Sequence, residues 1–251
     1  MLLLETRDLV KCYNGRAVVD HVSFEVHQGE IIGLLGRNGA GKTTSFRMTI
    51  GMITPEQGTV IFDGVNVTKM PMHKRARRGM GYLSQEPSIF QRLTVRQNIM
   101  AVMETMALSK QDRKEQCDQL LEQFGLSRLS RQLARTLSGG ERRKLEIARA
   151  LVTNPTMILL DEPFSGVDPI AVEDLQREIL GLKGRGISIL LTDHNVRETL
   201  TVTDRSYIID SGKVLREGMP RELVNDEMVR RTYLGRTFRG DEFDVPGIAS
   251  P

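Results

Sequence analysis

The chain has 251 residues, of which 39% are apolar, and its Lys and Arg outnumber its Asp and Glu by 35 to 32, giving a formal net charge of +3. This length is near the upper limit for one hydrophobic core and favours one compact domain with subdomains over two independent ones. The weak, interspersed positive charge argues against a protein that grips nucleic acid, and no run of about 18 apolar residues predicts a membrane-spanning helix.

Neither the cysteines nor the first residues suggest a secreted protein. Cys12 and Cys117 lie far apart and form no CxxC pair, so we expect a reducing compartment and neither a zinc site nor a redox motif. The leucine run within residues 1–5 is too short for the apolar region of a secretory signal.

The first predicted elements are two strands, over about 3–10 and 18–26, joined by a turn at Asn14-Gly15, which is a strong hairpin signal. We expect this hairpin to form an antiparallel edge ahead of the next motif. Tyr13, beside the turn, has no obvious core partner in the sequence. From the residues alone, packing at a strand end and a functional contact are both open for it.

A glycine-rich segment follows the apolar run 31–35 and precedes a helix predicted over about 44–51. Two glycines five residues apart, then lysine and a hydroxyl residue, match the phosphate-binding pattern in the strand, loop and helix context that it requires. The glycines let successive N–H groups turn toward phosphate oxygens, and the helix adds its positive N-terminal end. We therefore expect Lys42 to reach the β- and γ-phosphates and the Thr43 hydroxyl to bind Mg2+. The segment consists of Gly36, Arg37, Asn38, Gly39, Ala40, Gly41, Lys42, Thr43 and Thr44.

A short strand predicted over 58–62 is followed by a basic segment, 69–78, with five Lys or Arg residues and His73. Such a charge run is more typical of a solvated helix face than of a lipid-headgroup or partner surface. The next strand, over 80–83, delivers Gln85 just past its carboxyl end. Ligands bind at that edge of an open α/β sheet, so Gln85 is a candidate nucleotide contact.

Two amphipathic helices are predicted next, one beginning at Thr94 and one over 110–124, with no strand between them. They predict a helical insertion over about 86–135 in an otherwise alternating α/β fold. With the helix that follows, the helical subdomain extends to about residue 155.

That third helix, reaching to about residue 152, opens with Leu137-Ser138-Gly139-Gly140-Glu141. A serine cap followed by two glycines leaves N–H groups and the positive helix end open to a second anion. Ordinary N-capping explains Ser138 taken alone. The glycine pair favours close approach by another group, because glycine costs about 1 kcal/mol within a helix.

The all-apolar run 157–160 is typical of a central parallel strand, and it ends in Asp161-Glu162. Two carboxylates at the end of a buried strand cost desolvation energy unless a cation meets them, and Mg2+ is the natural candidate. We expect Asp161 to order the metal and Glu162 to orient or deprotonate the attacking water. A capping role for one of the pair is the alternative.

The rest of the chain continues the alternation. A turn at Asp168 leads into a helix over 170–182, and the buried strand over 187–191 is followed by His194, a candidate γ-phosphate contact that could instead be structural. A last hairpin over 205–217 and a helix over 220–233 complete the predicted elements. The proline-containing stretch 241–251 predicts a disordered tail.

In this order and spacing, the motifs resemble an ATP-binding cassette (ABC) ATPase over about residues 3–238. The resemblance implies an α/β P-loop NTPase, with an ABC-type core, an antiparallel β subdomain and an inserted helical subdomain, in one ATPase domain over 1–240. It also implies that Tyr13 stacks on adenine, that Gln85 touches Mg2+ and that His194 contacts the γ-phosphate.

The same resemblance implies ATP and Mg2+ as cofactors and a head-to-tail homodimer with ATP at its interface. Ser138 to Glu141 would close over the ATP held by the second copy, Asp168 would lie at the seam, and hydrolysis at Glu162 would release the dimer. The implied catalytic residues are Lys42, Gln85, Glu162 and His194; the implied nucleotide contacts are Tyr13, the segment Gly36 to Thr44, Gln85, Ser138, Gly139, Gly140, Glu141, Asp168 and His194; the implied metal ligands are Thr43, Gln85 and Asp161.

A narrower resemblance, carried by 75–83, 137–151 and 192–200, is to the ATPases of bacterial lipopolysaccharide export systems. Arg37 and Ser84 depart from it, since proline is common at both positions there. It implies a protein on the cytoplasmic face of the inner membrane that powers lipopolysaccharide extraction and touches the membrane only through partners. Two membrane-spanning subunits would dock near Phe90 and Arg92, although Phe90 could also be tucked under its own loop.

Two other functions stay open at this point. Branched-chain amino acid importer ATPases share the arginine-rich segment before Gln85, but the 192–200 stretch favours export. A non-transport ABC ATPase acting on nucleic acid or ribosomes would be expected to have tandem cassettes, a coiled-coil insertion or a basic arm, and none is visible in the sequence.

Overall fold

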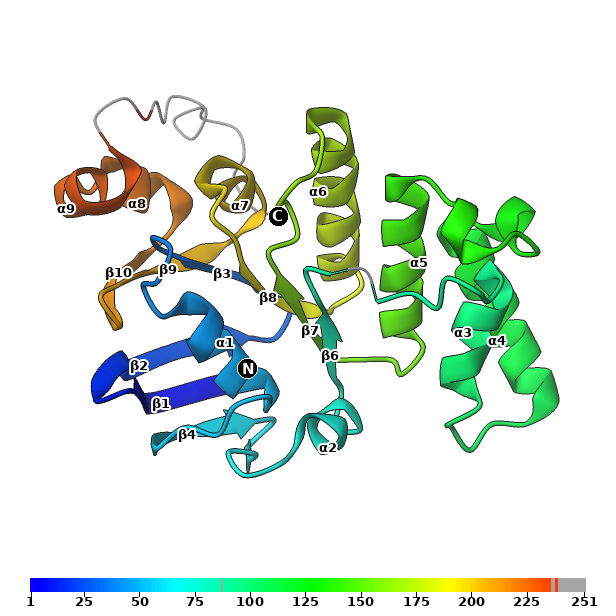
Figure 1. Ribbon diagram of the computed structural model, residues 1–251, viewed down its shortest axis with the longest axis horizontal. Helices are drawn as coiled ribbons and strands as arrows, with labels where there is room; N and C mark the ends of the chain where they lie inside the picture. The colour runs from blue at the N-terminus through cyan, green and yellow to red at the C-terminus, as the bar shows by residue number, and fades with distance from the viewer. Residues whose placement is uncertain (87, 236–237, 239–251) are drawn as a thin grey trace.

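Two β-sheets and a set of inserted helices build the protein, seen in Figure 1. The computed structural model describes residues 1–86, 88–235 and 238, so the predicted disordered tail over 241–251 lies outside the described residues. The central sheet has the strand order β10-β9-β3-β8-β7-β6. Neighbouring strands from β9 to β6 pair in parallel, and β10 pairs antiparallel with β9. The strands are β3 (Ile31–Leu35), β6 (Met80–Leu83), β7 (Met157–Asp161), β8 (Ser188–Thr192), β9 (Arg205–Asp210) and β10 (Lys213–Gly218).

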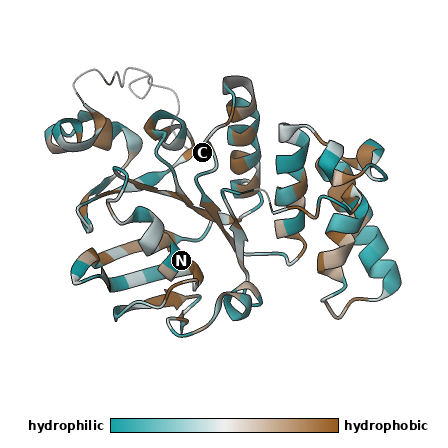
Figure 2. Cartoon of the chain, viewed as in Figure 1, coloured by the Kyte–Doolittle hydropathy of each residue, from teal (hydrophilic) through white to brown (hydrophobic). Residues whose placement is uncertain are grey.

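Strands β3, β7 and β8 are buried at every residue, as their nearly continuous apolar sequences require. Figure 2 shows this hydrophobic band running through the middle of the molecule, with hydrophilic residues on the outer helices. Because the strands are parallel, their carboxyl ends meet at one edge. Among the predicted functional residues, Gly36, Gln85 and His194 follow those ends and Asp161 is the last residue of β7, so the sheet brings them together.

The N-terminal hairpin belongs to a separate four-stranded sheet in the order β2-β1-β4-β5, which is the antiparallel β subdomain that the resemblance implied and not an edge of the central sheet. Its apolar side chains share one core with β3, β7 and with α1, which lies between the two sheets. The strand patterns alone could not show this, because period-2 patterning fixes which face of a strand is buried and not which sheet it joins. The elements are β1 (Leu2–Tyr13), β2 (Arg16–His27), β4 (Gln57–Phe62), β5 (Val65–Asn66) and α1 (Lys42–Ile50).

The predicted helical insertion between β6 and β7 is confirmed as a group of helices. Thr94, Ser109 and Ser138 each begin a helix with a capping box, in which the cap hydroxyl and the acidic or amide side chain three residues later satisfy each other's N–H groups. These helices share a core with the outer faces of β7 and β8. They are α3 (Val95–Met103), α4 (Lys110–Gln123) and α5 (Gly139–Leu151), with short turns at Ser127–Leu129 and Ala134–Thr136.

The remaining helices complete the same face of the central sheet, because the helix after Asp168 shares the core of the inserted helices and the helices nearer the C-terminus cover the β3–β9 end. The helix predicted over 220–233 is interrupted, because Asp226 leaves the helical conformation and accepts a hydrogen bond from the Val229 N–H at 2.8 Å. Apolar side chains of the helices after residue 195 cover Leu35 and Ile208 of the central sheet. These elements are α6 (Pro169–Lys183), α7 (Val196–Val202), α8 (Pro220–Asn225), α9 (Glu227–Val229) and a π-helical turn at Arg230–Leu234.

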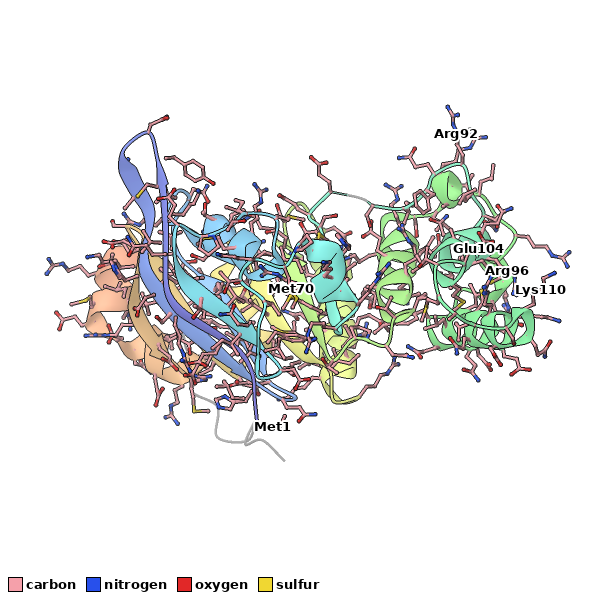
Figure 3. The ribbon with its side chains drawn as sticks, turned by 90° about the horizontal axis from the view of Figure 1, so that it is seen from below. Met1, Met70, Arg92, Arg96, Glu104 and Lys110 are labelled. Carbon is pink, nitrogen blue, oxygen red and sulfur yellow. The ribbon has the colours of Figure 1, made fainter. Side chains whose placement is uncertain are left out.

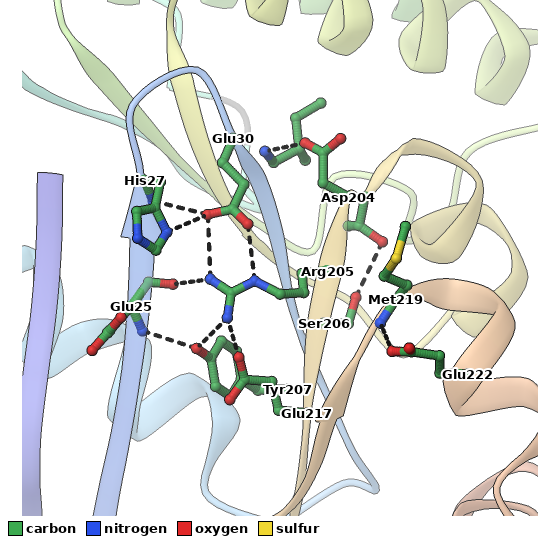
Figure 4. Close-up of polar contacts among 12 residues, drawn as sticks. Glu25, His27, Glu30, Asp204, Arg205, Ser206, Tyr207, Glu217, Met219 and Glu222 are labelled. Atoms are coloured by element: carbon green, nitrogen blue, oxygen red, sulfur yellow. Dashed lines mark hydrogen bonds and ion pairs between the residues drawn. The ribbon is translucent and has the colours of Figure 1, made fainter. Parts of the chain in front are cut away.

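One polar network, drawn in Figure 4, ties β9 to β10 and to the loop before β3. Arg205 donates to Glu30 at 2.9 Å, to the Tyr207 hydroxyl at 3.1 Å and to Glu217. The ion pair with Glu30 outweighs partial burial and raises the pKa of Arg205. The network therefore fixes the amino ends of the central strands, opposite the edge that carries the predicted site.

The basic segment 69–78 was predicted to be a solvated helix face, and for Arg75 that prediction is wrong. The segment forms α2 (Met72–Ala76), and Arg75 is 1% exposed. Its guanidinium donates to four backbone carbonyls, including Met48 and Thr49 in the last turn of α1 at 2.9 and 2.5 Å. Burial lowers the pKa of Arg75 to about 10. A cation at a helix C-terminus is favourable, so Arg75 anchors the far end of the helix that starts at Lys42.

Arg75→Met should destabilise the fold by about 3 kcal/mol or more, because it leaves several buried carbonyl groups without donors. Urea unfolding followed by circular dichroism measures the difference. Arg77→Met, at an exposed position two residues further on, is the matched control and should change stability by less than about 0.5 kcal/mol. Equal stabilities of the two variants would contradict the anchoring role.

Candidate active site

The segment Gly36 to Thr44 forms the loop between β3 and α1, and two of its glycines are required by close contacts. A Cβ at Gly36 would lie 2.1 Å from the Ile209 carbonyl oxygen, and one at Gly41 would lie 2.6 Å from that of Val18. Gly41 also has a left-handed φ of 107° where α1 begins. The loop is thus wedged between β9 and β2, which aims its N–H groups and the N-terminus of α1 at one point.

A cavity of about 460 Å3 lies against this loop. Gln85, Glu162 and His194, which come from three different strand ends, line it together with the loop. Its other lining residues are Val18, Asn38, Gly39, Ala40, Gly41, Lys42, Thr43 and Thr44. The sequence predicted for each of these three residues a place near the nucleotide or its metal, and the structure brings their side chains to one cavity.

Lys42 is buried within the loop, where its ammonium donates to the carbonyls of Gly36 at 2.5 Å and Arg37 at 3.0 Å. Burial lowers the pKa of Lys42, and the negative charges of Glu162 and Asp193 oppose that shift. A buried ammonium held by neutral carbonyls gains strongly from an anionic partner. Lys42 can therefore exchange these carbonyls for phosphate oxygens.

Asp161 is buried at the end of β7, and its hydrogen bonds come only from neutral hydroxyls among the described residues, Tyr82 at 3.4 Å and Thr192 at 3.3 Å. Burial raises the pKa of Asp161, although the charge of Arg47 opposes the shift. Such a carboxylate fits a divalent cation. Mg2+ is usually held by one or two carboxylates together with waters and phosphates.

Glu162 meets both Gln85 and His194 at the cavity. The Gln85 amide nitrogen donates to Glu162 Oε2 at 3.1 Å, and His194 Nδ1 lies 3.4 Å from the same oxygen. Glu162 has a left-handed φ of 45°, which is uncommon for a residue with a side chain and is frequent at functional sites. This conformation turns its carboxylate out of the strand and into the cavity.

The comparisons with known proteins agree with this geometry. The sequence model of the ABC transporter family matches residues 19–165. The chain belongs to the ABC transporter ATPase family. It is 52% identical to the lipopolysaccharide export system ATP-binding protein LptB of Haemophilus influenzae and 50% identical to that of Escherichia coli K12, over 95% of this chain and 100% of each relative.

Solved structures show the same fold. An ATP-binding cassette of an ABC transporter in its ADP conformation is 29% identical, with a TM-score of 0.84, and the match covers 94% of this chain and all of the other. A nucleotide-free cassette gives a TM-score of 0.83 at 28% identity over the same share of each chain. ATP hydrolysis is the activity that membership of this family implies. None of the helices in the part of this ABC ATPase that the structure describes is long and apolar enough to cross a bilayer.

The structure does not bring the second predicted anion site to the phosphate loop of the same chain. Gly139, Gly140 and Asp168 line a different cavity of about 280 Å3 between α5 and α6, although Gln85 and Glu162 border both cavities. Ser138 and Glu141 cap α5, and the Ser138 N–H lowers the pKa of Glu141. Asp168 caps α6 through the Ala171 N–H at 3.1 Å. A Cβ on either glycine would meet no described atom within 4 Å beyond the neighbouring backbone of its own helix, so packing among the described residues does not require glycine there.

Two other predicted contacts lie outside the first cavity. Tyr13 is 44% exposed at the end of β1, with the Lys11 ammonium 5.5 Å from its ring centre. Tyr13 therefore ends a strand with its ring largely open to solvent, and both interpretations, packing at a strand end and a functional contact, stay open for it. Arg37 is exposed and contributes only its carbonyl to Lys42, and the Ser84 hydroxyl donates to the Glu86 carbonyl at 2.7 Å. Neither departure from proline removes a ligand from the cavity.

Sequence reasoning missed three residues that hold the site, Tyr82, Thr192 and Asp193. Tyr82 and Thr192 lie on the strands that flank β7, where a hydroxyl next to Asp161 can be recognised only once the strand order is known. Asp193 could have been found, because it is a carboxylate directly after a buried strand, the same signal that identified Asp161.

Lys42→Ala should weaken ATP binding about 10- to 100-fold, because a charge-assisted hydrogen bond of roughly 1.5–3 kcal/mol is lost. Titration calorimetry with ATP and Mg2+ measures it. Lys110→Ala, at an exposed position at the start of α4 (Figure 3), removes the same charge far from the cavity and should leave the affinity unchanged. Wild-type affinity in the Lys42 variant would contradict the phosphate-binding assignment.

Proposed function

We propose that this ABC ATPase is the motor subunit that powers extraction of lipopolysaccharide from the bacterial inner membrane for export to the outer membrane. The convergence of Gln85, Glu162 and His194 on the cavity beside the phosphate loop supports a hydrolytic motor. The names of the relatives that are 50–52% identical over nearly the whole chain support the substrate. The chain would act from the cytoplasmic face and touch the membrane through partner subunits.

The proposed hydrolysis uses the residues in the following roles. The loop N–H groups and Lys42 bind the phosphates of ATP, and Tyr13 offers an exposed ring for stacking on adenine. Thr43, Asp161 and the Gln85 amide oxygen would hold Mg2+, which neutralises charge on the phosphates when bound. Glu162 accepts the proton of the attacking water, Gln85 orients its carboxylate, and His194 contacts the γ-phosphate.

A second copy of the chain completes each site in this proposal. The N-terminus of α5, with its two uncovered glycines, would bind the γ-phosphate of the partner's ATP, and Asp168 would lie at the seam. Close approach of a phosphate would explain glycine at both positions. Two ATP molecules would then join the subunits head to tail, and hydrolysis would release them.

Phe90 and Arg92 offer the anchor for the membrane subunits. Phe90 is 48% exposed, and Figure 3 shows Arg92 projecting beyond the helical insertion. The Phe90 ring lies against the Arg149 guanidinium at 4.7 Å, and Arg149 donates to the Ser88 carbonyl at 2.7 Å. Because Arg149 belongs to α5, force applied at Phe90 would reach the helix whose N-terminus faces the partner's ATP.

Glu162→Gln should retain ATP binding while turnover falls at least about 100-fold, because general base catalysis is lost. The trapped nucleotide should hold two chains together, as measured by size-exclusion chromatography with light scattering in ATP and Mg2+. Glu104→Gln, on an exposed helix end, is the matched control. Hydrolysis near the unmodified rate would reject Glu162 as the base, and a monomer at saturating nucleotide would reject the dimer.

Phe90→Ala should keep ATP binding but lose co-purification with the membrane subunits, because a central apolar anchor carries much of the energy of such an interface. Met228→Ala removes a similarly exposed apolar side chain on α9 and should assemble normally. Assembly of the Phe90 variant would reject the anchor.

The intact complex in proteoliposomes should release lipopolysaccharide only with ATP, and hydrolysis without release would overturn the proposed substrate.

A further inference from the structure

Beyond the ends of β7 and β8, side chains continue the hydrogen-bond ladder between the two strands. The backbone pairing ends with Asp161 opposite Thr192, and the Glu162 N–H still donates to the Thr192 carbonyl at 2.8 Å. Asp193 Oδ2 then accepts the Phe164 N–H at 2.8 Å, and Asn195 Nδ2 donates to the Phe164 carbonyl at 3.2 Å. Asp193 and Asn195, in the loop after β8, thus hold the N–H and the carbonyl of Phe164, in the loop after β7.

Asp193 is fully buried and joins both loops with one carboxylate. Its Oδ1 accepts the backbone N–H groups of His194 at 2.7 Å and Asn195 at 2.9 Å, while Oδ2 is used for Phe164. A buried carboxylate is tolerated only when its oxygens are well satisfied. Because an ionised carboxylate has acceptors on both oxygens, it alone among side chains of this size can accept from both segments at once.

The residues held in this way are the ones that converge at the cavity. Glu162 has a left-handed φ of 45°. The hydrogen bond from its own N–H to the Thr192 carbonyl holds it on one side, and the bond from the Phe164 N–H to Asp193 holds the chain two residues later. His194 is fixed through its backbone by the same Asp193 carboxylate. A sparsely populated backbone conformation persists when its surroundings over-determine it, and these bonds supply that constraint.

We propose that Asp193, assisted by Asn195, is a positioning residue for ATP hydrolysis. It locks the Glu162 turn and the His194 loop into one unit and so keeps the two side chains 3.4 Å apart. The proposal rests on the hydrolytic roles proposed for Glu162 and His194 and is independent of what is transported.

Asp193→Asn changes the side-chain volume very little. Its amide NH2 group must face either the Phe164 N–H or the two loop N–H groups, so at least one of these hydrogen bonds is lost. We expect kcat to fall about 10- to 100-fold, as for a small displacement of catalytic groups, with KM and the Kd for ATP within about two-fold of the unmodified chain. Asn195→Ala, which removes one hydrogen bond, should lower kcat about 2- to 10-fold. Thr199→Val is the control, since the buried Thr199 hydroxyl has no hydrogen-bond partner in the described structure.

Hydrogen exchange separates positioning from a general loss of stability. In Asp193→Asn the Phe164 amide should exchange faster, while the β9–β10 hairpin keeps its protection. Unchanged kcat in both lock variants, or faster exchange throughout the chain with a matching loss of ATP binding, would overturn the proposal. An unmodified chain that does not hydrolyse ATP would instead refute the proposed function, and the exchange of Phe164 would still test the lock.

Discussion

The parallel pairing of β3, β7 and β8 is the constraint on which the rest of the structure depends. It forces three loops to emerge at one edge, so that Lys42, Glu162 and His194 meet although more than a hundred residues separate the first from the others. The pairing itself is stabilised by apolar side chains buried on both faces of each strand. A change within these strands would therefore disturb every part of the site at once.

That edge concentrates buried charge. Lys42, Asp161 and Asp193 are each at most 5% exposed. Burial lowers the pKa of Lys42 and raises the pKa of Asp161 and of Asp193, so that it favours the neutral form of each group. The three groups are held differently. Asp193 is satisfied by backbone N–H groups, whereas Lys42 is held by carbonyls of its own loop and Asp161 by long bonds from hydroxyls. Lys42 and Asp161 are the two expected to bind phosphate and metal, whereas Asp193 is saturated by backbone N–H groups.

Local patterns in the sequence predicted most of this site. The glycine spacing of 36–41, the buried runs that end at Asp161 and before His194, and the serine cap at 138 each depend on a few neighbouring residues. Arg75 could not be predicted, because its burial depends on the last turn of α1, about 26 residues away, whose carbonyls need a donor. The separate N-terminal sheet was predicted only through the resemblance, which implied an antiparallel β subdomain, since its pairing with β4 joins distant segments that local patterns cannot connect.

The two predicted anion sites of one chain line separate cavities. Gln85 and Glu162 border both cavities, and their hydrogen bond lies where the helical insertion meets the central sheet. The loop after Gln85 runs to Phe90, which is backed by Arg149 of α5. Movement of α5 relative to the sheet would therefore strain this bond from one side, while the Asp193 lock holds Glu162 from the other. In the proposed mechanism, a base held by the Asp193 lock beside a glutamine at the root of the helical insertion is the arrangement expected if hydrolysis is to depend on the position of the inserted helices.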